Sequence, residues 1–173
     1  NKFKNKNFYL GSRFSNNQIK KELEKHKKKL KFKFHKDITK VSADIIANKK
    51  ILGWFQGAAE FGPRALGNRS IICQPFPVEM KDHLNKNVKF RESFRPFAPA
   101  VLDFKAKDFF NMNQDSEHML IAVKVKKNKK NLIPAVVHAD NSSRAQTVSK
   151  KSNFKFYNLI NNFYKISKIP IVV

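Results

Sequence analysis

Three short segments gather arginine, lysine and hydroxyl side chains of the kind that bind anions. The first runs Gly57-Ala-Ala-Glu-Phe-Gly-Pro-Arg-Ala-Leu-Gly-Asn-Arg-Ser70 and places Arg64 and Arg69 five residues apart in a glycine-rich turn. A guanidinium group holds a phosphate or carboxylate through two parallel hydrogen bonds. We therefore predict that Arg64, Arg69 and Ser70 bind a polyanion. The alternative is a structural turn whose arginines pair with Glu60 or Glu92.

This turn resembles a phosphate-binding P-loop only in part. Gly62 and Gly67 are separated by four residues, as the P-loop requires, but Asn68-Arg69 follows where Lys and then Ser or Thr are needed. The next residues, Ile71–Cys73, favour a strand, so no helix N-terminus follows to receive a phosphate. A P-loop is therefore excluded.

The second segment is Lys89-Phe-Arg91-Glu-Ser-Phe-Arg95-Pro-Phe-Ala-Pro99. Alternation along an extended chain predicts that four polar side chains share one face, while Phe90 and Phe94 pack on the other. Such a face suits a triphosphate and a small carbonyl substrate, and its members are Lys89, Arg91, Ser93 and Arg95. The alternative is a surface strand whose arginines form salt bridges with Glu92.

The third segment, His138–Thr147, carries His138, Asp140 and Arg144 around a serine-rich turn that could complete such a site. The alternative for His138 is a hydrogen-bonded residue of the core. The five histidines show no spacing that favours a catalytic triad or a metal site. A single cysteine, Cys73, excludes a disulfide framework and, inside an apolar run, is expected to pack in the core.

The charge of the chain lies mainly in its two flanks. The net charge is +23, of which residues 1–50 carry +12, residues 51–123 carry +1 and residues 124–173 carry +10. The lysine runs Lys27–Lys29 and Lys126–Lys130 are typical of solvated surface, although they would also suit a nucleic-acid backbone. The apolar runs are too short to cross a bilayer, so no membrane partner is expected, and the location we expect is cytoplasmic.

Helical and strand patterns alternate along the chain, which predicts an α/β fold with a mixed sheet and flanking helices. Residues 1–14 are interpreted as a linker, and residues 15–173 as the domain. We predict helices from Ser15 (with Ile19, Leu23 and Leu30 on one face), from Asp37, over Val78–Val88, near Lys105–Phe110 and over Phe154–Ile166. We predict strands over Ile51–Phe55, Ser70–Cys73, Phe97–Leu102, Met119–Val125, Val136–His138, Ala145–Val148 and Ile169–Val173, with a loop at Phe90–Pro96.

The three segments, in this order, resemble the C-terminal half of the NodU/CmcH family of O-carbamoyltransferases. The match comprises Gly53-Trp-Phe-Gln-Gly57, Glu60–Ser70, Lys89–Pro99 and His138–Val148. The resemblance implies a YrdC-like fold that joins a carbamoyl group from carbamoyl phosphate to ATP, with Mg²⁺, and releases pyrophosphate. An N-terminal Kae1-like domain, which holds a metal of its own and is not in this chain, would then transfer the carbamoyl group to a substrate hydroxyl.

Carried over by position, the resemblance assigns catalytic roles to Lys89, Arg91 and Arg95, which would hold carbamoyl phosphate and the nucleotide phosphates. Arg64, Arg69, Ser70, Ser93, His138 and Arg144 would complete the substrate and nucleotide site.

Three departures from the family pattern accompany the match. Ala58 stands where the family usually has Arg, and Gln74-Pro75-Phe76 stands where it has Asp-Pro-Arg. The family also continues beyond Val173 into a Leu-Asn-Thr-Ser-Phe-Asn strand, so we expect the sheet to be incomplete at the C-terminus. Two alternatives stay open: the net charge of +23 also suits a basic RNA-binding module of the same fold, and the departures at Ala58 and Phe76 also suit a domain that has lost catalysis.

Overall fold

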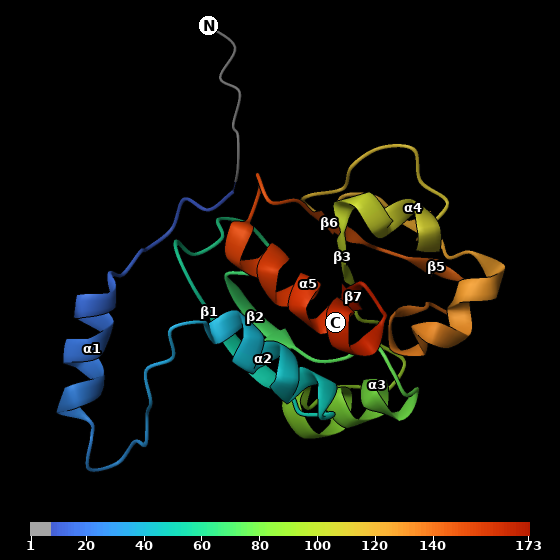
Figure 1. Cartoon of the computed structure of the whole chain (residues 1–173). Helices are drawn as coiled ribbons and strands as arrows, with labels where there is room; N and C mark the ends of the chain where they lie inside the picture. The colour runs from blue at the N-terminus through green and yellow to red at the C-terminus, as the bar shows by residue number, and fades with distance from the viewer. Residues whose placement is uncertain (1–7) are drawn as a thin grey trace, which may run out of the picture.

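The computed structural model describes residues 8–173, and Figure 1 shows their arrangement. The helices are α1 (Asn16–Lys25), α2 (Ile38–Ala47), α3 (Glu79–Leu84), which continues as a π-helical turn (Asn85–Lys89), α4 (Ala106–Phe109) and α5 (Phe154–Ser167). The strands are β1 (Leu52–Phe55), β2 (Arg69–Ile72), β3 (Ala100–Leu102), β4 (Val123–Lys124), β5 (Ser142–Ser143), β6 (Gln146–Val148) and β7 (Ile171–Val172). Short 3₁₀ turns lie at Asp103–Lys105, Lys127–Leu132 and Pro134–Val136.

The central sheet is mixed, in agreement with the predicted fold class. Its order is β6-β3-β7, with β3 parallel to β6 and antiparallel to β7. Strands β1 and β2 form an antiparallel pair beside it. Cys73 and Val173 exchange two backbone hydrogen bonds, of 3.4 and 2.9 Å, which tie the end of β2 to the end of β7.

Hydrophobic cores lie on both faces of this sheet because neighbouring residues of β3 point to opposite sides. Leu102 belongs to the cluster beneath α2 and α5, together with Ile46 and Phe163. Val101 belongs to a second cluster with Phe110. Helices α2 and α5 lie side by side over the first cluster (Figure 1), and both cores hold the strand ends at fixed positions.

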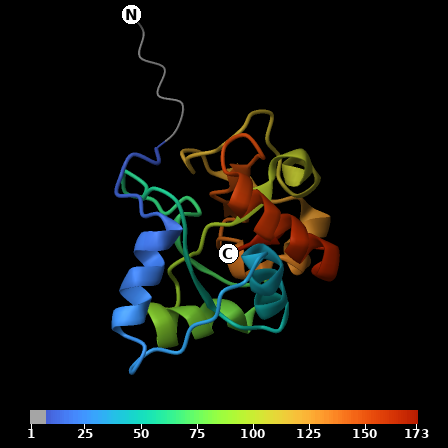
Figure 2. The same cartoon turned by 60° about the vertical axis from the view of Figure 1, so that its left-hand side comes forward.

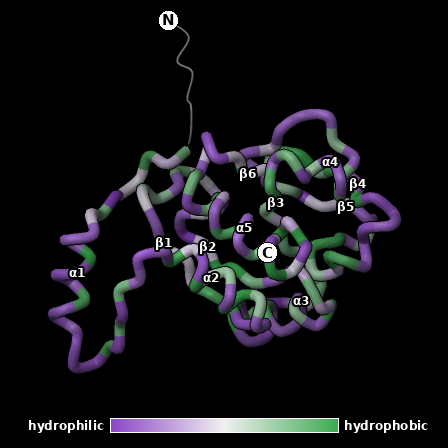
Figure 3. Tube along the Cα trace, in the orientation of Figure 1, coloured by the Kyte–Doolittle hydropathy of each residue, from purple (hydrophilic) through white to green (hydrophobic). Residues whose placement is uncertain are grey.

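Helix α1 begins where the sequence predicts, but it does not pack as expected. Ser15 and the Gln18 side chain form a reciprocal capping box at its N-terminus. None of its residues is buried, Ile19 is 38% exposed, and Leu30 lies beyond the last turn. Figure 1 shows the helix standing away from the body, Figure 2 shows it from a second side, and Figure 3 shows that most of its residues are hydrophilic. The lysines in and after this helix are exposed and therefore accessible, and nucleic-acid binding by them remains a prediction.

Two predicted strands differ most from the structure, while the predicted strands over Phe97–Leu102 and Ile169–Val173 are only shorter than expected, at Ala100–Leu102 and Ile171–Val172. Over Val136–His138 the chain instead leaves the 3₁₀ turn that Pro134 begins. The amides of Val136 and Val137 donate back to the carbonyls of Ile133 (3.2 Å) and Pro134 (3.4 Å), so they are not available to a neighbouring strand. Of Met119–Val125, only Val123–Lys124 forms a strand, paired with β5. No helix in residues 8–173 is both long and apolar enough to cross a membrane.

Candidate active site

The glycine-rich turn between β1 and β2 is organised by one carboxylate. Glu60 Oε1 accepts hydrogen bonds from the backbone amides of Leu66 (2.7 Å), Asn68 (2.8 Å) and Arg69 (3.2 Å). Hydrogen bonds to an ionised acceptor are stronger than those between neutral groups. The predicted alternative, in which Glu60 pairs with an arginine of the turn, is therefore wrong, because this carboxylate binds the backbone.

Gly67 allows the turn to lie directly on α5. Its φ is +96°, in the region that favours glycine, and a Cβ at this position would lie 2.2 Å from Cδ1 of Phe156. The Gly67 carbonyl accepts hydrogen bonds from Trp54 Nε1 (2.9 Å) and Gln56 Nε2 (2.8 Å). The turn is thus fixed from below by a helix and from the side by β1 and the residue that follows it.

Residues before α1 pack against the same turn. The Phe61 amide donates to the Phe8 carbonyl (2.7 Å), and the Gly11 amide donates to the Ala59 carbonyl (2.9 Å). Tyr9 Oη donates to the Leu66 carbonyl at 2.9 Å. Within the proposed linker, residues 1–7 lie outside the described residues, whereas residues 8–12 contact the turn.

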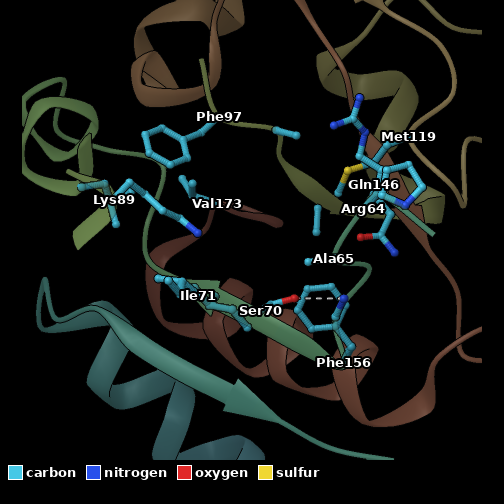
Figure 4. Close-up of a pocket in the computed structure, with 16 residues that line it drawn as sticks. Arg64, Ala65, Ser70, Ile71, Lys89, Phe97, Met119, Gln146, Phe156 and Val173 are labelled. Atoms are coloured by element: carbon cyan, nitrogen blue, oxygen red, sulfur yellow. Dashed lines mark hydrogen bonds between the residues drawn. The ribbon is translucent and has the colours of Figure 1, made fainter. Parts of the chain in front are cut away.

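A cavity of about 240 Å³ opens between this turn and the end of the π-helical turn. Its polar lining comes from Arg64, Ser70, Lys89 and Gln146, and its apolar lining includes Phe97. Figure 4 shows Arg64 and Gln146 on one side of the cavity, with Lys89 across from them. The structure thus brings together three of the predicted residues from two segments that are distant in sequence.

A second hollow of about 300 Å³ adjoins the first and shares Pro63, Arg64 and Met119 with it. Arg144 lines this second hollow. Burial, and then the neighbouring charge of Arg64, lower the pKa of the Arg144 guanidinium. Arginine nevertheless stays protonated at neutral pH, so two cations lie close together here.

These cations have no acidic partner among the described residues. Arg64, Lys89 and Arg144 form no salt bridge within residues 8–173, and Arg144 Nε is buried without a hydrogen-bond partner. Arg64 and Lys89 are exposed, whereas Arg144 is half-buried, and a partly buried cation without a counter-charge is unfavourable. Phosphate or a similar anion would supply that charge, so the two joined hollows form a candidate anion site.

Arg69 does not line either hollow. Its guanidinium donates to the carbonyls of Gln56 (2.6 Å), Asn68 (2.8 Å), Gly57 (3.1 Å) and Ser12 (3.2 Å), and it lies 3.5 Å above the centroid of the Phe55 ring. The side chain closes the outer side of the turn. Its role in binding a substrate therefore remains a prediction. In the structure the side chain stabilises the glycine-rich turn.

The loop after Lys89 does not have the extended alternation that the sequence predicts. Phe90 has φ of 48° and is 83% exposed, and Phe94 is 75% exposed, so neither ring packs. The chain curls because Asn85 Nδ2 donates to the carbonyls of Ser93 (3.2 Å) and Arg95 (3.1 Å). The region is a loop, as expected for Phe90–Pro96, and its side chains do not share one face.

The cations of this loop are therefore separated. Arg91 Nε donates to Asn85 Oδ1 (2.7 Å), and its guanidinium lies 4.6 Å from the centroid of the Phe97 ring. Arg95 forms an exposed ion pair with Glu92 at 2.8 Å, as the alternative for this segment expects. Neither arginine lines the cavity with Lys89, nor does Ser93, so their substrate roles remain predictions.

His138 does not line either hollow. Its Nδ1 is 3.3 Å from Ser142 Oγ, whose hydroxyl donates to Asp140 Oδ1 at 2.6 Å. Because the serine hydroxyl faces the carboxylate, the imidazole is not placed to activate it. Burial is the main cause that lowers the His138 pKa. His138 is hydrogen-bonded, as the alternative expects, but it is half-buried and does not belong to the core.

Two lining residues, Gln146 and Met119, were not predicted. Gln146 belongs to the third segment, directly after Arg144-Ala145, but an amide carries no charge to draw attention to it. Met119 has a positive φ of 54° and closes both hollows from the loop before β4. Only the folded arrangement brings these residues to the cations.

Residues 43–173 match the family described as Carbamoyltransferase C-terminus. This chain belongs to that family. It is 45% identical over 140 residues to nodulation protein NolO of Bradyrhizobium diazoefficiens, a match covering 79% of this chain and 26% of that protein. It is 41% identical over 135 residues to nodulation protein U of Sinorhizobium fredii (78% and 24%). An uncharacterised Synechocystis protein is 37% identical over 187 residues (95% and 30%). The chain thus spans less than a third of the length of these relatives.

Two positions that depart from the family pattern are structural here. Ala58 is buried, and its carbonyl accepts a hydrogen bond from Asn68 Nδ2 at 2.7 Å. The Phe76 ring stacks on Phe163 with centroids 6.4 Å apart. Both side chains fill space within the domain and supply no charge to the hollows.

Proposed function

We propose that this chain is the activating part of a carbamoyltransferase, which forms carbamoyl adenylate from carbamoyl phosphate and ATP in a YrdC-like domain. The observation that carries the proposal is the cluster around two joined hollows of three cations, Arg64, Lys89 and Arg144, none of which forms a salt bridge within residues 8–173. The carbamoyl group would then pass to a hydroxyl-bearing acceptor bound elsewhere in the full-length protein.

The arrangement supports this chemistry through positioning and charge. Carbamoyl phosphate and ATP are both anions that repel each other in water. Arg64 and Lys89 line opposite sides of the first cavity, where they would hold one phosphate, and Arg144 extends the positive surface into the second. Fixed cations neutralise and align the two reactants, which removes part of the barrier.

The reaction balances if one water is consumed. Water takes the phosphoryl group of carbamoyl phosphate and releases inorganic phosphate, which leaves carbamate. A carbamate oxygen then attacks the α-phosphorus of ATP and displaces pyrophosphate. Both steps separate anionic products, so the same cations would stabilise charge at the phosphorus atoms throughout.

Magnesium would enter this site as part of the substrate MgATP. No carboxylate appears among the described residues that line the two hollows, and no cluster of three or more metal-binding side chains occurs within residues 8–173. Magnesium bound in proteins usually keeps a carboxylate ligand beside the nucleotide phosphates. We therefore assign no residue of this chain as a metal ligand.

The proposal is tested by exchange of labelled pyrophosphate into ATP. We expect exchange that requires carbamoyl phosphate and that Lys89→Met abolishes. Lys86→Met changes a lysine on the same π-helical turn that is as exposed as Lys89 but lies outside the cavity lining, so it should leave exchange unchanged. Absence of exchange in the folded wild-type chain, or equal loss in both variants, would contradict the proposed function.

A further inference from the structure

Gln146 presents a buried acceptor to the cavity. The residue lies on β6, is 3% exposed and lines the cavity with Arg64. Its Nε2 donates to the Leu66 carbonyl at 3.1 Å, whereas its Oε1 is buried and has no hydrogen-bond partner among residues 8–173.

The orientation of this amide is fixed by its neighbours. Rotating it by 180° would bring Oε1 against the Leu66 carbonyl, which already accepts from Tyr9 Oη at 2.9 Å. Two acceptors facing each other repel, so the NH₂ group must face Leu66. Oε1 is therefore the amide atom that can accept a hydrogen bond from a ligand in the cavity.

A buried acceptor without a donor is unfavourable, and native proteins satisfy nearly all such groups. The cavity therefore calls for a ligand that carries both an anion, for Arg64 and Lys89, and an N–H donor, for Gln146. The carbamoyl group ends in such a donor. Acetyl phosphate has nearly the same shape, but a methyl group replaces the amine.

We propose that Gln146 Oε1 accepts a hydrogen bond from the carbamoyl amine and thereby selects carbamoyl phosphate over acetyl phosphate. This inference rests on the proposed function, because it assumes that the carbamoyl donor occupies the first cavity. Ser70 would bind an oxygen that both ligands share, so it adds affinity without adding selectivity. Its Oγ accepts from the Gly67 amide at 3.1 Å, so its hydroxyl hydrogen is available to a ligand oxygen.

Two stable phosphonates provide the test. Phosphonoacetamide imitates carbamoyl phosphate, and acetonylphosphonate imitates acetyl phosphate, with a methylene group in place of the bridging oxygen. By isothermal titration we expect the wild-type chain to bind the amide about tenfold more tightly, since the ketone leaves the acceptor unpaired. In Gln146→Met this ratio should fall to about one, with the ketone affinity changed by less than about twofold.

Gln74→Met is the matched control. Gln74 is also buried with an unpartnered amide atom, but it lies outside the cavity lining, so this variant should keep the wild-type ratio. If Gln146→Met does not fold, Gln146→Asn takes its place, because it withdraws the amide by one methylene.

The outcomes separate this inference from the function on which it rests. Equal binding of the two phosphonates to wild type, or an unchanged ratio in the Gln146 variant, would overturn the role of Gln146 while leaving the anion site intact. Failure of both phosphonates to bind the folded wild-type chain would refute the proposed function, and the assignment of Gln146 with it.

Discussion

The two cationic segments that meet at the cavity are held in very different ways. Glu60 binds three backbone amides of the Gly57–Ser70 turn, and Gly67 lies against Phe156 of α5. The Lys89–Pro99 loop is tied mainly through Asn85 and exposes both of its first phenylalanines. The turn on one side of the cavity is therefore held by hydrogen bonds and packing within the domain, whereas the loop on the other side lies on the protein surface with few such contacts.

The same contrast occurs between arginines within the turn itself. Arg69 gives its guanidinium to four backbone carbonyls, whereas Arg64, five residues earlier, has no acidic partner in the described chain and lines both hollows. An arginine that the protein itself satisfies stabilises structure, and one that it leaves unsatisfied is available to a ligand. Residue type alone does not separate the two roles.

The largest effect should follow from replacing the glycine of the turn that lies against Phe156. Gly67→Ala adds a Cβ that would clash with the Phe156 ring, at a residue whose φ is positive. We therefore expect the free energy of unfolding to decrease by about 3 kcal/mol or more. Chemical denaturation measures this loss. Gly53→Ala, with nothing within 4 Å of the added Cβ, is the control and should change stability little. Equal stability of the two variants would show that the turn does not depend on Phe156.

A smaller effect should follow from Arg69→Lys. Lysine cannot reach four carbonyls with a planar fork, so we expect a loss of about 2 kcal/mol in stability. Arg64→Lys should leave the free energy of unfolding unchanged. The reverse result in denaturant titrations would contradict the division of roles between the two arginines.

The smallest effect should be a pH dependence from His138, which is half-buried and whose Nδ1 lies 3.3 Å from Ser142 Oγ. Burial and the charges of Arg144 and Lys81 lower its pKa, and Asp140 acts in the opposite direction. The unfolded chain therefore takes up the proton first as pH falls below about 6.5. Thermal midpoints should decrease from pH 7.5 to 5.5, and His138→Gln should reduce that decrease. An identical slope in wild type and variant would exclude this contribution.

The sequence predicted those elements that local chemistry determines. Ser15 and Asp37 cap helices as expected, and the continuous apolar run after Lys50 forms β1. The prediction that Lys89–Arg95 is extended with one polar face is wrong. The Asn85 side chain, which lies before this segment, donates hydrogen bonds to the carbonyls of Ser93 and Arg95, and the chain curls. The two hydrogen bonds from Asn85 therefore outweigh the alternation of polar and aromatic residues on which the prediction was based.

The candidate site was predictable only in its charges. Arg64, Lys89 and Arg144 carry the residue types and motif positions that predict anion binding. The supporting position of Arg69 and the acceptor at Gln146 depend on which backbone carbonyls lie nearby, and no local pattern encodes that. A specific site needs such supporting and hydrogen-bonding groups in addition to its cations, and these are the parts that the sequence pattern does not predict.

The central claim, that Arg64 belongs to a specific anion site, is tested most directly by titrating inorganic phosphate into wild type, Arg64→Met and Arg13→Met. Arg13 is an exposed arginine before α1 and lines neither hollow. We predict that Arg64→Met weakens phosphate binding about tenfold or more, while Arg13→Met leaves it unchanged. Equal weakening in both variants would mean that phosphate responds only to the net charge of +23, and would contradict the account.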